Sequence, residues 1–160
     1  MRSFSLLALV AAAIIGSSSA LKDASKRTKV TVSANAYDER TSDDGCSPSG
    51  CAPGLTRDKS WSSDSRWSCS EKLDDEQCEI KYMFKKPQDI VQLRVKFYKG
   101  NERVRSLKVT DNNGFKKFIT SSGTANGYEK FDLGTDESKW LALEGKGLEN
   151  DEWISITEVR

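Results

Sequence analysis

The stretch Arg57–Cys69 reads Arg-Asp-Lys-Ser-Trp-Ser-Ser-Asp-Ser-Arg-Trp-Ser-Cys and gathers charged, hydroxyl and aromatic side chains in one short segment. Its hydroxyl groups compete for local hydrogen bonds and no apolar residue recurs at helical spacing, which predicts a loop running into a short strand at Arg66–Ser68. We expect Asp58 and Ser65 to point oxygens at one cation while Trp67 turns inward. The simpler alternative is a surface loop that only Trp67 anchors.

Outward from this loop, short alternating apolar segments separated by turn residues predict strands. Ile90–Tyr98 is the strongest of them, Pro87 is expected to end the strand before it, and the Asn-Gly pair in Asp111–Gly114 predicts a tight hairpin. No segment favours a helix. The expected fold is therefore all-β, an antiparallel β-sandwich jelly roll. The expected strands are Lys29–Ala34, Arg66–Ser68, Cys78–Phe84, Ile90–Tyr98, Val104–Thr110, Phe115–Ser121, Tyr128–Leu133, Lys139–Glu144 and Glu152–Val159.

The first residues of the chain predict export. Arg2 precedes the unbroken apolar run Leu6–Ile15, and small residues follow at Ser18–Ala20, a pattern typical of a secretory signal peptide over residues 1–20. The run is short for a membrane span and no second one follows, so no transmembrane segment is expected. We expect a flexible leader at residues 21–28 and one secreted domain at residues 29–160.

Charge composition narrows the class of partner. Removing the predicted signal peptide with its single basic residue leaves equal numbers of basic and acidic residues. Nucleic-acid binding requires a strongly basic face, so no nucleic-acid partner is expected. Bulk electrostatic attraction to a membrane is also disfavoured, although a local basic patch stays open.

Four cysteines in an exported chain predict two disulfides, and three pairings are open to them. We favour Cys46–Cys51 and Cys69–Cys78, because each closes a short polar loop and neither constrains the core. A zinc site is the competing interpretation. The spacings are not those of paired CxxC motifs and the chain has no histidine, so we disfavour it.

Five segments in order carry a resemblance to a known family. They are Asp58 with Ser65–Ser68, Val95–Arg103, Val109–Asp111, Ser121–Thr124 and Glu152–Val159. Together they resemble discoidin-like, coagulation-factor C-terminal-type domains, above all the family-32 carbohydrate-binding modules joined to alginate lyases and related polysaccharide-degrading enzymes. The resemblance covers nearly all of residues 30–159. It implies a galactose-binding-domain-like jelly roll with ligand loops at one end.

The resemblance also implies a structural calcium ion. Carried over to this chain, its side-chain ligands would be Asp58, Ser65 and Glu158, completed by main-chain carbonyls, and an oxygen-only ligand set suits calcium. The alternative is that Glu158 is a solvated strand residue.

The chain departs from the family pattern beside the expected ligand face. The insert closed by Cys46 and Cys51 and the acidic loop before Cys78 are not general features of the family. Ile154 and Gly147-Leu148 stand where relatives commonly have Asn and Gly-Asn. The exact sugar therefore cannot be carried over by analogy.

A sugar site needs an aromatic face and planar hydrogen-bonding groups, and arginine binds a uronate carboxylate in bidentate fashion. Trp61 is the leading candidate, because a tryptophan at a loop tip has no evident structural role. Tyr98 is expected on the platform or in the core, and Trp67 and Trp140 in the core. The carbohydrate-binding candidates are Tyr37, Arg40, Trp61, Arg66, Lys99, Asn101, Arg103 and Trp153.

Several of these candidates have a structural alternative. Arg66 could brace the loop by pairing with an acid such as Asp64, and Asn101 and Arg103 could simply shape the turn after Gly100. Trp153, opposite Ile154 in its strand, is either exposed near the site or packed beneath a loop.

The function we expect is that of a secreted, non-catalytic, lectin-like module that binds polysaccharide, an acidic uronate polymer, at a cell wall or matrix. One shallow site binds weakly, so self-association or a repetitive ligand would add avidity. The first alternative is an adhesion module for protein or anionic lipid, with Leu55 and Trp61 as its exposed apolar tips. The second is a small polysaccharide lyase with Tyr37 or Tyr98 as base. The absence of histidine excludes Ser-His and Cys-His nucleophiles.

Overall fold

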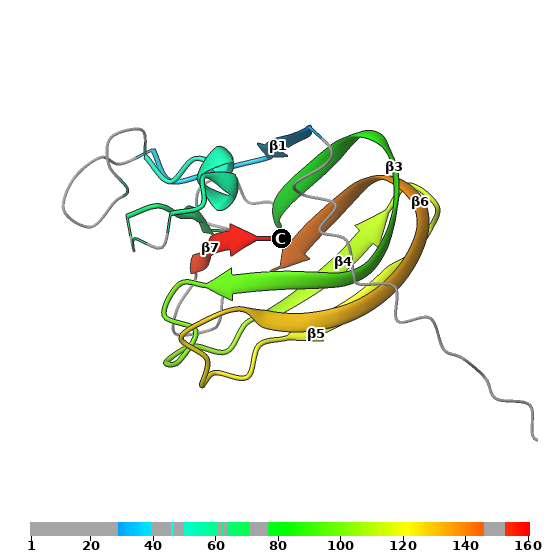
Figure 1. Cartoon of the computed structure of the whole chain (residues 1–160). Coiled ribbons are helices and arrows are strands. Elements are labelled where there is room, and N and C mark those ends of the chain that lie inside the picture. Colours follow the sequence, from blue (N-terminus) through cyan, green and yellow to red (C-terminus); the bar gives the residue numbers. More distant parts are fainter. Residues whose placement is uncertain are drawn as a thin grey trace, which may run out of the picture.

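The computed structural model describes residues 29–39, 46, 50–60, 62, 64–70, 77–145 and 153–160. The predicted signal peptide and leader lie outside these residues. Within them the fold is all-β and antiparallel, as predicted (Figure 1). No helix in this part of the chain has the length and apolar character needed to cross a bilayer. The elements are β1 (Val30–Ala34), η1 (Pro53–Arg57, a 3₁₀ helix), β2 (Trp67–Ser70), β3 (Cys78–Phe97), β4 (Ser106–Asp111), β5 (Lys116–Thr120), β6 (Glu129–Gly145) and β7 (Trp153–Val159).

Two long strands, β3 and β6, curve sharply and build both layers of a sandwich (Figure 1). In the five-stranded layer the first part of β3 pairs with β1 and with the last part of β6, which pairs in turn with β4, and β4 with β5. In the four-stranded layer the last part of β3 pairs with the first part of β6 and with β7, and β7 with β2. The predicted β-sandwich is confirmed.

The prediction of nine separate strands is wrong at the two bends. β3 runs through Pro87, where the sequence predicted a strand end, and β6 runs through the predicted loop at residues 134–138. The β3–β6 register shifts between Met83 and Gln88, so the missing N–H of Pro87 falls where the ladder is already interrupted. In β6 the kink falls on Gly134 and Glu137, which both have positive φ. Turn residues here bend strands instead of ending them.

The core lies between the two layers and contains Trp67, as predicted. Its indole is buried and its Nε1 donates a hydrogen bond to the Ala36 carbonyl at 3.0 Å. The assignment of Trp140 to the core is wrong. Leu141 and Leu143 are buried in the core, and strand alternation turns Trp140 to the opposite side of β6, where it is half-buried and outside the core cluster.

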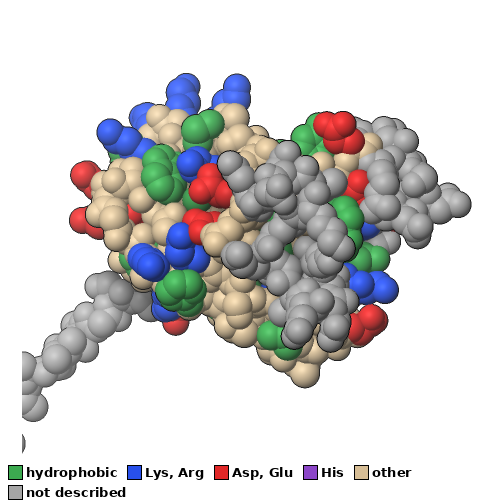
Figure 2. Space-filling model, turned by 180° about the vertical axis from the view of Figure 1, so that it is seen from behind, with side chains coloured by type: hydrophobic (Ala, Val, Ile, Leu, Met, Phe, Trp, Pro, Cys, Tyr) green, Lys and Arg blue, Asp and Glu red, His purple; other side chains and the backbone are tan. Residues whose placement is uncertain are grey.

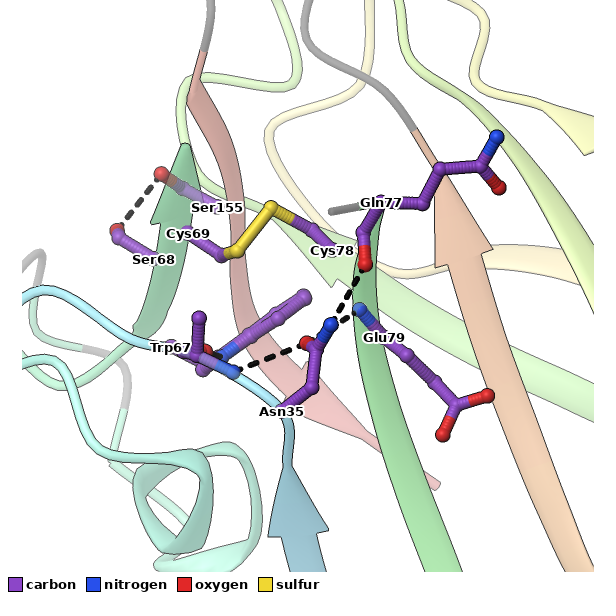
Figure 3. The surroundings of a disulfide bond; sticks show 9 residues. Asn35, Trp67, Ser68, Cys69, Gln77, Cys78, Glu79 and Ser155 are labelled. Atoms are coloured by element: carbon purple, nitrogen blue, oxygen red, sulfur yellow. Dashed lines mark hydrogen bonds between the residues drawn. A yellow bond between two sulfur atoms is a disulfide. The ribbon is translucent and has the colours of Figure 1, made fainter. Parts of the chain in front are cut away.

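Both disulfides pair as predicted, Cys46 with Cys51 and Cys69 with Cys78. The expectation that neither constrains the core is wrong for the second, because both of its sulfur-bearing residues belong to the core cluster. Figure 3 shows how the chain around it is held: Asn35 donates from Nδ2 to the Gln77 carbonyl at 2.7 Å, and its Oδ1 accepts the Glu79 N–H at 2.9 Å. The disulfide thus ties β2 to the start of β3.

Candidate functional site

The helix η1 sets the position of the chain that follows it, because hydrogen bonds fix η1 to two strands. Thr56 donates to the Pro53 carbonyl at 2.8 Å and accepts the Tyr82 hydroxyl of β3 at 2.9 Å. Burial raises the pKa of Tyr82, so the phenol stays a neutral donor. Arg57 donates from Nη1 to the Val159 carbonyl of β7 at 3.1 Å. Asp58, the next residue, is therefore held against the end of β7.

The structure brings the three predicted calcium ligands together beside η1. The Ser65 hydroxyl donates to the Asp58 carboxylate, whose other oxygen accepts the Ser60 N–H at 2.7 Å. Lys59, whose φ of 66° is left-handed, donates its N–H to Glu158 Oε2 at 3.2 Å. Residues far apart in sequence thus form one oxygen-rich cluster, which we call the Asp58–Glu158 cluster.

Glu158 is not the solvated strand residue of the alternative interpretation, because only 3% of it is exposed. Burial raises the pKa of its carboxyl, and the neighbouring charge of Asp58 raises it further. Arg160 opposes this shift, with its Nε 3.5 Å from Oε1. Among the residues that the structure describes, no three His, Cys, Asp or Glu side chains gather as metal ligands. A cation here would therefore use the Ser65 hydroxyl and main-chain carbonyls besides the two carboxylates.

A second cluster surrounds the ring of Tyr98 at the end of β3. The guanidinium carbon of Arg66 lies 4.3 Å from the ring centroid, that of Arg103 lies 5.7 Å away, and Lys99 Nζ lies 5.8 Å away. Lys99 has a left-handed φ of 51°, and its carbonyl accepts the Arg103 N–H at 3.0 Å. This tight turn folds both cations back over Tyr98. We call these four residues the Tyr98 cluster.

The buried side of the Tyr98 cluster is a row of hydrogen-bonded polar groups. Arg66 is buried and donates from Nε to Ser68 Oγ at 3.1 Å, and that hydroxyl lies 2.7 Å from the hydroxyl of Ser155. The Ser155 carbonyl accepts the Tyr98 N–H at 3.1 Å. Trp153 is half-buried and two residues before Ser155, on the same side of β7. Arg66 therefore acts as a brace beneath Tyr98, while Lys99 is exposed and Arg103 half-buried.

Carbohydrate-binding modules are among the solved structures that have the same fold. The family-32 module of AlyQ, solved with 4,5-unsaturated mannuronic acid, is 23% identical with a TM-score of 0.64 over 81% of this chain and 91% of that chain. A pectin-binding module is 18% identical with a TM-score of 0.65 over 83% and 90%. The family-32 module of NanJ from C. perfringens, solved with galactose, is 14% identical with a TM-score of 0.56 over 81% and 90%.

The chain has the discoidin-like fold of the family-32 carbohydrate-binding modules. This confirms the fold that the sequence resemblance implied. No protein-family model and no curated protein sequence matches the chain. Some modules with this fold are parts of enzymes: a truncated AlyQ joins one to an alginate lyase domain, and this chain covers 30% of that structure.

The remaining candidates lie apart from the two clusters or outside the described residues. Asn101 is exposed in the turn after Tyr98, and Tyr37 is half-buried and packs against the core. Arg40 and Trp61 lie outside the described residues, so their predicted roles stay predictions. The sequence analysis missed the paired hydroxyls under the Tyr98 cluster. Ser68 and Ser155 pair directly across β2 and β7, on the side of these strands away from the core cluster, and a serine between apolar residues in both segments was a signal that could have found them.

Proposed function

We propose that the protein is a secreted, non-catalytic carbohydrate-binding module that recognises a uronate-containing polysaccharide of a cell wall or matrix at the Tyr98 cluster. The observation that carries this proposal is the gathering of Arg66, Lys99 and Arg103 around one tyrosine ring. A solved module of the same fold holds 4,5-unsaturated mannuronic acid, which supports a carboxylated sugar as ligand.

The three cations have different tasks in this proposal. Arg66 is buried and braced, so it fixes Tyr98 and supplies a permanent positive charge beneath it. Arg103 offers a planar fork that matches a carboxylate in bidentate fashion. Lys99 is a flexible point charge, and its contact with Glu102 is long, 3.9 Å, between exposed groups. A uronate carboxylate can replace such a surface pair at little cost.

A structural calcium ion in the Asp58–Glu158 cluster is the second part of the proposal. Two carboxylates and a hydroxyl converge there, and these hard oxygen donors are the ligands that calcium prefers. Glu158 is buried beside a like charge, so a cation would offset both the burial and the repulsion. The ion would hold the loop after η1 against β7. Arg66 lies at the end of that same loop, directly before β2, so the ion would also help to position Arg66.

Calorimetric titration tests the sugar assignment with matched arginine variants. We expect saturable heat with uronate oligosaccharides and less with neutral galactosides. Arg103→Gln should weaken uronate binding about tenfold, because a charge-assisted bidentate contact is lost. Arg94→Gln, an exposed arginine of β3, is the control and should bind like the parent protein. Arg103→Lys separates charge from fork geometry, and unchanged binding in Arg103→Gln would remove this cluster from the site.

Two other outcomes would move the assignment to a different class. Binding to anionic liposomes without any sugar heat would favour the lipid-binding adhesion module, whose tips would be Leu55 and Trp61. Leu55 is half-buried in η1, which argues against that role. Unsaturated product released from a uronate polymer would favour the lyase, with Tyr98 as base. Sedimentation with and without polymer tests the expected self-association.

A further inference from the structure

The outward side of the five-stranded layer carries a second group of aromatic and cationic side chains. Leu107, Val109, Leu141 and Leu143 are buried in the core, so the residues between them point outward. Strand register places partner residues side by side on one surface of a sheet. These partners, which we call the open face, are Met83 with Trp140, Lys81 with Ala142, Glu79 with Glu144, Ala142 with Thr110, Thr110 with Lys116, Glu144 with Lys108, and Lys108 with Phe118. Ala142 itself has no exposed surface, so the side chains around it form the face.

Two aromatic rings on this face each lie close to an ammonium group. Phe118 is 67% exposed on β5, and Lys116 Nζ lies 5.3 Å from its ring centroid. Trp140 is half-buried, and Lys81 Nζ lies 4.7 Å from its ring centroid. Met83 beside Trp140 is 42% exposed. A large exposed aromatic has no role in the core, and an exposed aromatic ring offers the flat apolar surface on which a sugar ring can pack.

We propose that the open face is a second binding surface for the same acidic polysaccharide. Trp140 and Phe118 would contact the apolar C–H faces of sugar rings, and Lys81 and Lys116 would pair with their carboxylates. Lysine suits this task because its flexible stem lets the ammonium leave the ring for a carboxylate. Lys81 Nζ also lies 3.3 Å from Glu79 Oε1, and a uronate carboxylate would replace Glu79 in this partly exposed pair. This inference rests on the proposed function, since it assumes that the ligand is a uronate polymer.

The distribution of apolar groups favours a glycan over a protein as occupant. Protein interfaces have a contiguous apolar centre depleted in charge. Here Lys108 and Glu144, paired at 2.6 Å, lie on the strands between Phe118 and the rest of the face, and they separate Phe118 from the Met83–Trp140 pair. Figure 2 shows the same pattern beyond the grey residues, where small hydrophobic groups stand among charged side chains. Separate rings among cations match a chain of carboxylated sugars.

The spacing of the two rings makes this surface sensitive to ligand length. Phe118 pairs with Lys108 and Lys108 with Glu144, which is four residues beyond Trp140 in β6. With strands about 4.8 Å apart and about 3.4 Å per residue, the two rings are roughly 15–20 Å apart. One or two sugars cannot touch both. The open face should therefore add affinity only for longer oligosaccharides, which bridge both rings and gain the benefit of multivalency.

The experiment compares a uronate disaccharide, a long uronate oligosaccharide and the polymer, titrated into the full chain and three variants. The test variants are Trp140→Ala and Phe118→Ala/Lys116→Gln. The control is Val91→Ala, which removes an exposed apolar group, 54% exposed, from the part of β3 in the other layer. We expect each test variant to lose about fivefold in affinity for the long ligands, to bind the disaccharide normally, and the control to change nothing.

The outcomes separate this inference from the proposed function. If Arg103→Gln weakens disaccharide binding as expected while both test variants keep full polymer affinity, the Tyr98 cluster stands and the open-face site is overturned. If the parent protein binds no uronate ligand, both fall together. A dimer that Phe118→Ala/Lys116→Gln converts to monomer would make the face a self-association surface and also overturn the inference. Should Trp140→Ala fail to fold, the double variant decides alone, because both of its residues are exposed.

Discussion

Glu158 and Asp111 are two buried carboxylates in opposite regions of the sandwich, and their acidities shift in opposite directions. Glu158 is the last residue but one of β7 and is 3% exposed, and Asp111 is the last residue of β4 and is 5% exposed. Burial raises the pKa of Glu158, with further help from the charge of Asp58. Burial also opposes ionisation of Asp111, but hydrogen bonds outweigh it and hold the pKa of that carboxyl below its usual value. Two carboxyl groups that are similarly buried therefore differ in acidity.

The number of donors accounts for the difference. Asp111 accepts the N–H groups of Asn113 at 2.8 Å and Phe115 at 2.9 Å, and the Ser138 hydroxyl at 2.7 Å. Among the described residues, Glu158 accepts one backbone N–H at 3.2 Å and has a long contact to Arg160, and it lies near the charge of Asp58. A buried carboxylate whose oxygens accept several hydrogen bonds is stable in its ionised form and stabilises the fold. A buried carboxylate beside a like charge is electrostatically unfavourable, and this is the reason that we propose a cation there.

Removing Asp111 should give the largest effect, because its carboxylate is the one that accepts several hydrogen bonds. Asp111→Ala leaves three donors of the β4–β5 hairpin and the β6 bend without their acceptor, so we expect a loss of about 3 kcal/mol in the free energy of unfolding. Urea denaturation at neutral pH measures it. Asp111→Asn, which keeps the shape and removes the charge, should cost less, and an equal cost would show that charge is irrelevant.

The contribution of Asp111 should also depend on pH in one direction. Its folded-state pKa is lowered, so the ionised group adds stability above its unfolded pKa of about 3.9, and this is lost as the pH falls through the folded value. The difference between the parent protein and Asp111→Asn should therefore shrink in acid. A difference that grows in acid would contradict the hydrogen-bond explanation.

Glu158→Gln should give an intermediate effect whose sign depends on calcium. In chelator we expect the variant to melt at or slightly above the parent temperature, because a buried charge beside Asp58 is gone. In calcium the parent protein should gain stability by binding the ion, and the variant should not. Differential scanning fluorimetry in both buffers measures this, with Glu39→Gln, an exposed carboxylate, as the control. A full calcium response in Glu158→Gln would disprove the site.

Ser65→Ala should give the smallest effect. It removes one neutral oxygen from the Asp58–Glu158 cluster and leaves both carboxylates in place, so we expect a loss of about 1 kcal/mol or less in chelator. The calcium-dependent rise in melting temperature should shrink without disappearing. A rise identical to that of the parent protein would remove the Ser65 hydroxyl from the ligand set.

Sequence alone predicted the features that depend on local pattern. The Asn-Gly hairpin forms after Asp111 with Gly114 at a φ of 87°, and Trp67 is buried as expected. The approach of Asp58 and Ser65 was predicted from the local stretch that contains both. The approach of Glu158 to them came from the family resemblance, since nothing local in the chain links it to that stretch. The pairing of the cysteines followed from loop length, although their burial did not.

Sequence reasoning failed where tertiary context decides the outcome. Pro87 and Gly134 are ordinary strand breakers, yet both lie at bends where the β3–β6 ladder is irregular, so the strands continue. Trp140 was placed in the core by residue type, while its strand neighbours Leu141 and Leu143 already put it on the other surface. The stacking of Arg66 on Tyr98 joins β2 to the end of β3, and no spacing in the chain predicts it.

The sharing of β3 and β6 between the two layers has a consequence for how the domain forms. Neither layer has a complete set of strands of its own, so neither half can become ordered first and wait for the other. Most pairings join residues distant in sequence, which predicts slow folding in one all-or-none step. A chain stopped before β6 would leave both layers without a central strand. The domain can therefore be cut neither into two working halves nor shortened at its C-terminal side.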